Sequence, residues 1–180
     1  MTYDREQRTI MVHSAIAVLL AAAILVAGFA WLPPERLGLT DAMDEGERIA
    51  AALKADLFIL IWLAACVQAV ARGRFYSPAD RPGSAFAPPS PAIAVRSAVL
   101  QNSLEQTVLA LGAHLTLAVL LRGSELVLIP LLVALYLVGR LAFAFRYAQG
   151  AAARAFGMAL TGASILAGYG IALALLIAGR

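Results

Sequence analysis

Residues 126–147 read LVLIPLLVALYLVGRLAFAFRY, an apolar run in which Arg140 is the one charged residue before Arg146. The run is as long as the ~20 residues that a helix needs to cross the hydrocarbon of a bilayer. Backbone polar groups have no water to bind in lipid, so such a segment must satisfy them internally as a helix. This stretch therefore predicts a membrane-spanning helix with a cation inside it.

Four more apolar stretches of similar length follow the same pattern, at Ile10–Leu32, Ile49–Ala71, Val95–Leu121 and Ala155–Ala178. The 180-residue chain is 62% hydrophobic and 14% charged, with a mean hydropathy of +0.82. Soluble domains are usually under half apolar and about one quarter charged. We therefore expect an all-α fold, a polytopic membrane helix bundle with five transmembrane helices.

The first stretch has basic residues, Arg5 and Arg8, before its apolar core. This core is longer than the ~7–15 residues of a signal peptide, so we expect a retained membrane helix. The segment Arg72–Ala94 is rich in proline and predicts an irregular surface loop. The short turn Arg122–Glu125 predicts that the third and fourth helices form an antiparallel hairpin.

The arginines predict the orientation in the membrane. With five spans, one side carries the N-terminus, the Arg72–Ala94 loop and the Ala148–Arg154 connection, and its arginines are Arg5, Arg8, Arg72, Arg74, Arg81, Arg96, Arg146 and Arg154. The positive-inside rule places this side in the cytoplasm and the C-terminus outside. We expect an integral protein of a bacterial inner membrane. Its net charge of +3 is explained by lipid headgroups and topology, so we expect no nucleic-acid partner.

The third and fourth helices contain polar residues, and because charges inside a membrane are energetically costly, such residues usually have a partner or a function. Asn102, Glu105 and Gln106 are three and four residues apart, so they share one helix face. In the hairpin, Glu105 and Arg140 lie toward the same end, which predicts a buried Glu105–Arg140 pair. Such a pair could form part of a site, or it could only hold the two helices together.

Two further polar positions are interpreted as structural. His114 lies nine residues after Glu105, on the opposite face of the helix, and no second histidine or cysteine lies at ligand spacing. We expect helix packing for His114 and no metal site. Lys54 and Asp56 lie in the first turns of the second stretch, so we expect its hydrocarbon-spanning part to begin near Leu57.

The sequences Asn102-Ser103-Leu104-Glu105, Val138-Gly139-Arg140 and Arg146-Tyr147 together resemble the MAPEG family, the membrane-associated proteins in eicosanoid and glutathione metabolism. In that family one helix carries Asn-x-x-Glu, and the next carries Gly-Arg with a tyrosine seven residues after the arginine. The resemblance covers about Leu57 to the C-terminus. It implies two parts: 1–48, an extra N-terminal transmembrane helix with an external loop, and 49–180, a MAPEG-like four-helix membrane domain.

The resemblance also implies a function. It suggests a homotrimer that binds glutathione as co-substrate between protomers near the cytoplasmic face and acts, as transferase or peroxidase, on lipophilic small molecules that arrive from the membrane lipids. The implied binding residues are Asn102, Glu105, Arg140, Tyr147 and, nearer the cytoplasmic mouth, Arg96. The implied catalytic residues are Arg140 and Arg154, the latter being the nearest match to the family arginine that stabilises the thiolate.

Some features leave other functions open. Gln101 stands where members with the best-known activities usually have arginine, which would suit another thiol, or a non-catalytic scaffold or partner subunit that keeps the MAPEG fold. A small transporter with the buried pair as an ion relay is disfavoured, because no internal repeat or centrally broken helix is visible. The first helix is expected to pack on the outside of the trimer and to matter least.

Overall fold

The structure, a computed structural model, describes residues 2–180. Its five long helices are α1 (Arg5–Trp31), α2 (Glu45–Tyr76), α3 (Pro91–Leu120), α4 (Leu128–Arg146) and α5 (Ala151–Ile177). Short 3-10 turns flank them at Pro34–Leu37, Ser124–Val127 and Tyr147–Gln149. All five spans are long and apolar enough to cross a membrane. The predicted fold class is confirmed, and the chain is an integral membrane protein.

Helices begin several residues before the apolar runs because polar side chains cap them. Asp4 accepts from the backbone N–H of Gln7 at the start of α1, and Asp44 does the same for Glu47 at the start of α2. In both cases the later side chain bonds back to the capping residue, which completes a capping box. Ser90 caps α3 with proline at the first helical position. These three helices therefore begin in polar sequence, before the apolar runs.

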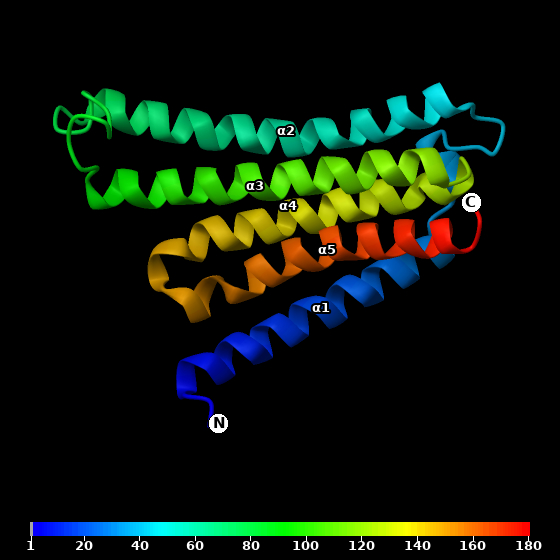
Figure 1. The fold of residues 1–180 in the computed structure, drawn as a ribbon, viewed down its shortest axis with the longest axis horizontal. Helices are drawn as coiled ribbons and strands as arrows, with labels where there is room; N and C mark the ends of the chain where they lie inside the picture. Colours follow the sequence, from blue (N-terminus) through cyan, green and yellow to red (C-terminus); the bar gives the residue numbers. More distant parts are fainter. Residues whose placement is uncertain (1) are drawn as a thin grey trace.

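The helices lie roughly along one direction (Figure 1). α2 packs mainly on α3, while α4 packs mainly on α5, and α1 lies along α5 and reaches α4 near its own C-terminal end. One end of the bundle carries the N-terminus, the loop 77–90 and the turn 147–150, and we call it the N-face. The other end carries the segment 32–44, the turn 121–124 and the C-terminus, and we call it the C-face.

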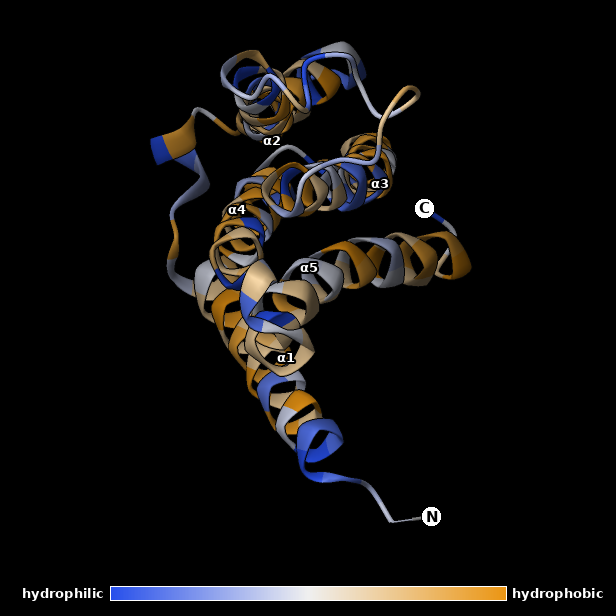
Figure 2. Ribbon diagram, turned by 90° about the vertical axis from the view of Figure 1, so that its left-hand side faces the viewer, coloured by the Kyte–Doolittle hydropathy of each residue, from blue (hydrophilic) through white to orange (hydrophobic). Residues whose placement is uncertain are grey.

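Apolar side chains cover much of the lipid-facing surface. Figure 2, seen from the N-face, shows hydrophobic residues along all five helices and hydrophilic residues concentrated at the ends and connections. Large side chains such as Leu19, Val26 and Leu166 are more than two-thirds exposed. This pattern suits a bundle whose solvent is lipid rather than water.

Two glycines allow α4 and α5 to touch at the level of Arg140. A Cβ at Gly139 would lie 2.7 Å from the backbone nitrogen of Thr161, and a Cβ at Gly157 would collide with the backbone of Phe143. Small residues at such crossings let helix backbones approach closely in membranes. The close crossing brings α5 within hydrogen-bond reach of the Arg140 side chain.

The connections at each face are fixed by a carboxylate. At the N-face, Asp80 accepts hydrogen bonds from Ser77 Oγ at 2.5 Å and from Ser90 N at 2.7 Å, and these bonds lower the pKa of Asp80. At the C-face, Asp41 accepts from Ser124 Oγ at 2.6 Å and Ser124 N at 2.9 Å, which lowers the pKa of Asp41 in the same way. Both loops are thereby tied to the neighbouring helix ends.

Candidate functional site

Arg140 is fully buried between three helices. Its Nε donates to Thr161 Oγ1 of α5 at 3.1 Å, and its Nη1 donates to Asn102 Oδ1 of α3 at 2.6 Å. Its Nη2 lies 3.7 Å from Met158 Sδ. All three partners are neutral, and within residues 2–180 Arg140 forms no ion pair with a carboxylate. The fold therefore holds a buried cation whose charge the described chain does not balance.

The predicted Glu105–Arg140 pair is wrong. Glu105 is exposed on the surface of α3 and accepts a hydrogen bond from Gln101 Nε2 at 3.0 Å. Residues three apart on a helix differ by about 60° around its axis. The packing of α3 on α2 and α5 turns Asn102 toward Arg140, and this offset leaves Glu105 outside.

A cavity of about 400 Å³ lies beside Arg140, toward the N-face. This volume falls within the range of small-molecule sites. Three of its wall residues, Asn102, Phe143 and Met158, contact the Arg140 side chain, so the guanidinium lies directly behind the wall. The wall comes from α1, α3, α4 and α5 with the turn before α5, through Ile10, Ser14, Asn102, Phe143, Tyr147, Ala151, Arg154, Ala155, Met158 and Ala159.

Arg154 and Tyr147 form the polar rim of this cavity. The Arg154 guanidinium carbon lies 4.3 Å from the centre of the Tyr147 ring, which is the geometry of a cation–π contact. Tyr147 in turn packs edge to face on Phe143, whose ring lies under the Arg140 guanidinium at 4.3 Å. Two adjacent aromatic rings, Phe143 and Tyr147, thus link the buried guanidinium of Arg140 to the half-buried guanidinium of Arg154.

The structure brings together some of the predicted site residues and separates others. Asn102, Tyr147 and Arg154 share the cavity wall, and Arg140 lies behind it. Glu105 lies outside on α3. Arg96 is exposed in the groove between α2 and α3, where its Nη1 donates to the carbonyl of Ala69 at 3.4 Å.

The sequence alone points to no role for the first helix at this site, yet Ile10 and Ser14 of α1 line the cavity. One hydrogen bond of 3.0 Å, between His13 Nδ1 and the carbonyl of Ala152, ties this part of α1 to the start of α5. The polar residues Ser14 and His13 in an apolar helix are the only local signal that could have indicated this contact.

A second buried polar cluster lies nearer the C-face. Asp56 of α2 and His114 of α3 are both fully buried, and a hydrogen bond of 2.6 Å joins Asp56 Oδ1 to His114 Nδ1. Asp56 Oδ2 has no hydrogen-bond partner within residues 2–180. His114 is buried between α2 and α3, and its role in helix packing stays a prediction. Asp56 is buried against α3, and the start of the hydrocarbon-spanning part of α2 near Leu57 stays a prediction.

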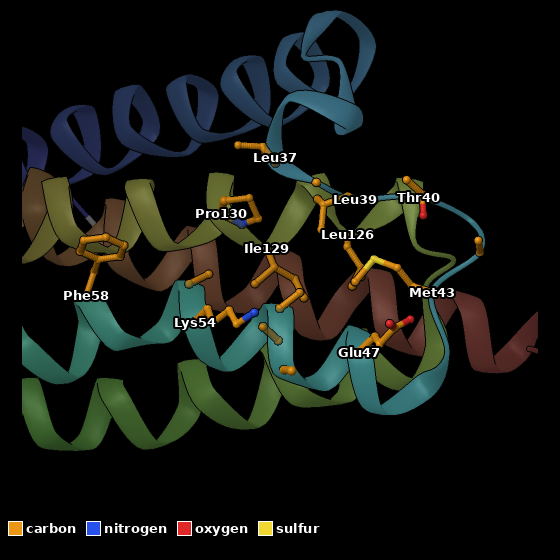
Figure 3. Close-up of a pocket in the computed structure, with 16 residues that line it drawn as sticks. Leu37, Leu39, Thr40, Met43, Glu47, Lys54, Phe58, Leu126, Ile129 and Pro130 are labelled. Carbon is orange, nitrogen blue, oxygen red and sulfur yellow. The ribbon is translucent and has the colours of Figure 1, made fainter.

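A larger cavity at the C-face holds none of the predicted site residues (Figure 3). Its volume is about 670 Å³, and α2, α4 and the segment before α2 enclose it. Its wall is mainly apolar, with Lys54 and Glu47 on the α2 side, and Glu47 is already used in the helix cap. The cavity beside Arg140 is therefore the better candidate for a polar ligand.

A family model described as the MAPEG family matches residues 49–174. The chain belongs to the MAPEG family. Comparisons with curated proteins and with solved structures found no match. The matched range runs from the first turns of α2 almost to the end of α5, so α1 lies outside it.

Membership places this MAPEG protein in a family of membrane proteins related to glutathione. The geometry fits an anionic ligand. Arg140 and Arg154 have no carboxylate partner among the described residues, and guanidinium groups bind carboxylates through strong, often bidentate hydrogen bonds. Nearby positive charge also favours the thiolate form of a bound thiol. The charge and hydrogen-bonding groups at this cavity are therefore of the kind that a carboxylate-bearing thiol requires.

Proposed function

We propose that this MAPEG protein is a glutathione-dependent transferase with peroxidase-type chemistry, acting on lipophilic electrophiles at the cavity beside Arg140. The observation that carries the proposal is the pair of arginines without carboxylate partners at one cavity of about 400 Å³. Two groups in the wall, Asn102 and Tyr147, can bind the rest of a peptide-like ligand.

Glutathione supplies two carboxylates, one amine and one thiol. Arg154, on the rim, meets one carboxylate, and Arg140 reaches the ligand when the ligand replaces its weak contact with Met158. In the transferase step the thiol loses its proton to solvent, and the thiolate forms a carbon–sulfur bond while the leaving group departs with the electron pair of its bond. In the peroxidase reaction two thiols reduce one lipid hydroperoxide to an alcohol and water and become a disulfide.

The proposed assembly is a homotrimer with the ligand between protomers, and Glu105 supports a neighbour at this level. The Glu105 carboxylate lies exposed at the middle of α3, beside exposed Leu104 and Val108. A charge facing hydrocarbon is costly, so a second protomer that covers this face would stabilise it. In this proposal Glu105 and Arg96 contribute to the site from the outer face of α3.

The proposed orientation places the N-face in the cytoplasm. The loops and helix ends at the N-face carry eight of the thirteen arginines of the chain, and the positive-inside rule favours such a side for the cytoplasm. The cavity lies toward that face, so a water-soluble thiol would enter from the cytoplasm while the electrophile would enter from lipid.

The test is conjugation of glutathione to an aryl halide by the protein purified in detergent. We expect turnover above the uncatalysed rate, and a loss of about 100-fold in kcat/KM for Arg154→Ala, the scale of removing one charge-stabilising group. Arg36→Ala removes an exposed arginine at the C-face and serves as the matched control. Unchanged activity in Arg154→Ala would contradict the assignment.

A second candidate is a non-catalytic scaffold or partner subunit. The observation that favours it is the hydrogen bond from Gln101 to Glu105, which occupies the carboxylate with a neutral side chain on its own helix. The assay that separates the two is turnover: a scaffold would give no conjugation or peroxide reduction, even where calorimetry detects bound glutathione.

A further inference from the structure

The cavity beside Arg140 has a polar part and an apolar part. Asn102, Tyr147 and Arg154 supply the polar part from α3, the end of α4 and α5. Where α1 meets α5, the wall is mainly apolar, formed by Ile10, Ala151, Ala155 and Ala159, with Ser14 as its one polar side chain. A ligand with a charged peptide at one end and an apolar group at the other would match both parts.

We propose that this apolar part, between α1 and α5, is the subsite for the lipophilic electrophile, and that Ile10 limits the length of the apolar group it accepts. The inference rests on the proposed function, because the polar part is then the glutathione subsite. It gives α1, which lies outside the family match, a role in choosing the second substrate.

The position of α1 against α5 is well fixed. Ala17 and Ala21 are buried, so small side chains let α1 approach its neighbours closely. The hydrogen bond between His13 and the carbonyl of Ala152 holds the same level of α1 to the first turn of α5. These contacts fix the separation of α1 and α5 beside the cavity, and a site that selects substrates by size needs such a fixed separation.

Ile10 and Ser14 are four residues apart and therefore lie on one stripe of α1. Both are half-buried and face the cavity, whereas Leu19 is 70% exposed and faces away from the bundle. The three alanines that line the same cavity on α5 have small side chains, which suits an alkyl or aryl group. Each methylene buried there is expected to tighten binding roughly threefold to fourfold until the group meets Ile10.

The experiment is calorimetry with S-methyl, S-butyl, S-hexyl and S-octyl glutathione, which resemble conjugation products, on the full-length protein in detergent. The affinity of wild-type protein is expected to rise with the length of the S-alkyl group and then to become constant. Ile10→Trp should reduce affinity for the longer chains at least tenfold and leave S-methyl glutathione within about twofold. In Ile10→Ala, the affinity should continue to rise up to a longer alkyl group than in the wild-type protein.

Leu19→Trp is the matched control, because it adds the same side chain to the lipid-facing side of α1. Binding of S-methyl glutathione reports whether each variant is folded. If wild-type protein binds the series and both Ile10 variants follow the wild-type profile, the subsite proposal is overturned and the proposed function stands. If wild-type protein binds none of the series, the proposed function fails and the subsite proposal fails with it.

Discussion

Two buried polar clusters lie at different levels of the same bundle, and they balance their charges differently. Near the C-face, the Asp56 carboxylate meets His114 across 2.6 Å, so a group that can carry positive charge faces the negative one. Toward the N-face, the contacts of the Arg140 guanidinium within residues 2–180 are with Asn102, Phe143, Met158 and Thr161, which are all neutral. The first cluster finds its counterpart within the fold, whereas the second leaves a positive charge without one.

We use this difference to tell a cluster that holds helices together from a cluster that binds a ligand. The Asp56 carboxylate already faces a group that can carry the opposite charge, so this cluster needs no ligand, although burying such a pair is itself costly. A buried guanidinium without a counterion favours an anion that enters from outside, and a cavity of about 400 Å³ lies beside it. We therefore propose that the Asp56–His114 cluster packs helices together and that the Arg140 cluster binds a ligand.

The largest expected effect is on stability, at the Asp56–His114 cluster. His114→Leu leaves the Asp56 carboxylate buried without any partner, because its second oxygen already has none in the described chain. Removing one partner of a buried pair costs about 3–5 kcal/mol. Thermal unfolding in detergent should show a large fall in Tm. His13→Leu, the same change at the half-buried histidine, should cost only about 1 kcal/mol.

The double variant Asp56→Leu/His114→Leu sharpens this assignment. Replacing both members of a buried pair by apolar residues is often neutral or stabilising by about 1–4 kcal/mol. The double variant is therefore expected to unfold at a higher temperature than His114→Leu alone. A double variant no more stable than the single one would show that the contact is not the cause of the loss.

Arg140→Met is expected to change stability little, in contrast to His114→Leu. It removes an uncompensated charge and leaves no buried carboxylate behind, since Thr161 Oγ1 still donates to the carbonyl of Gly157 at 3.0 Å. The free energy of unfolding is expected to stay within about 1 kcal/mol of the wild-type value. Thermal unfolding beside His114→Leu checks this, and an equally large fall in Tm would remove the distinction between the two clusters.

The smallest effect is expected outside both clusters, at Asp80 in the N-face loop. Hydrogen bonds from Ser77 and Ser90 lower the pKa of Asp80 in the folded state, so its contribution is present above the unfolded pKa of about 3.9 and is lost as pH falls through the lower folded pKa. Asp80→Asn should reduce the loss of stability in acid. Unfolding curves at neutral pH and near pH 3 measure the change, and equal acid sensitivity in both proteins would contradict it.

The five helices could be predicted because lipid imposes a simple rule on length and hydropathy, and each apolar run obeys it. Their ends could not be placed as well, because Asp44 and Ser90 extend helices into polar sequence through caps. Asn102, Tyr147 and Arg154, which the family motifs indicate, line one cavity, and their role in binding stays a prediction. Asn102, Tyr147 and Arg154 lie on two helices and one turn, and their spacing within these elements can be taken directly from the sequence.

The contacts between helices could not be predicted. Whether Asn102 or Glu105 faces Arg140 depends on a rotation of about 60° about the axis of α3, and packing against other helices decides it. Asp56 and His114 lie far apart in sequence, with no local pattern that joins them. The contribution of Ile10 to the cavity depends on how α1 lies against α5, and the periodicity of an apolar helix does not reveal this.

Titration of glutathione into the purified protein by calorimetry tests the central claim, that the unbalanced charge of Arg140 is there for an anionic ligand. Wild-type protein and Arg36→Ala should bind glutathione, whereas Arg140→Met, folded as judged by its Tm, should bind at least about 10-fold more weakly, the scale of one charge-assisted hydrogen bond. Equal affinity in Arg140→Met and wild-type protein, or no binding by either, would contradict the account.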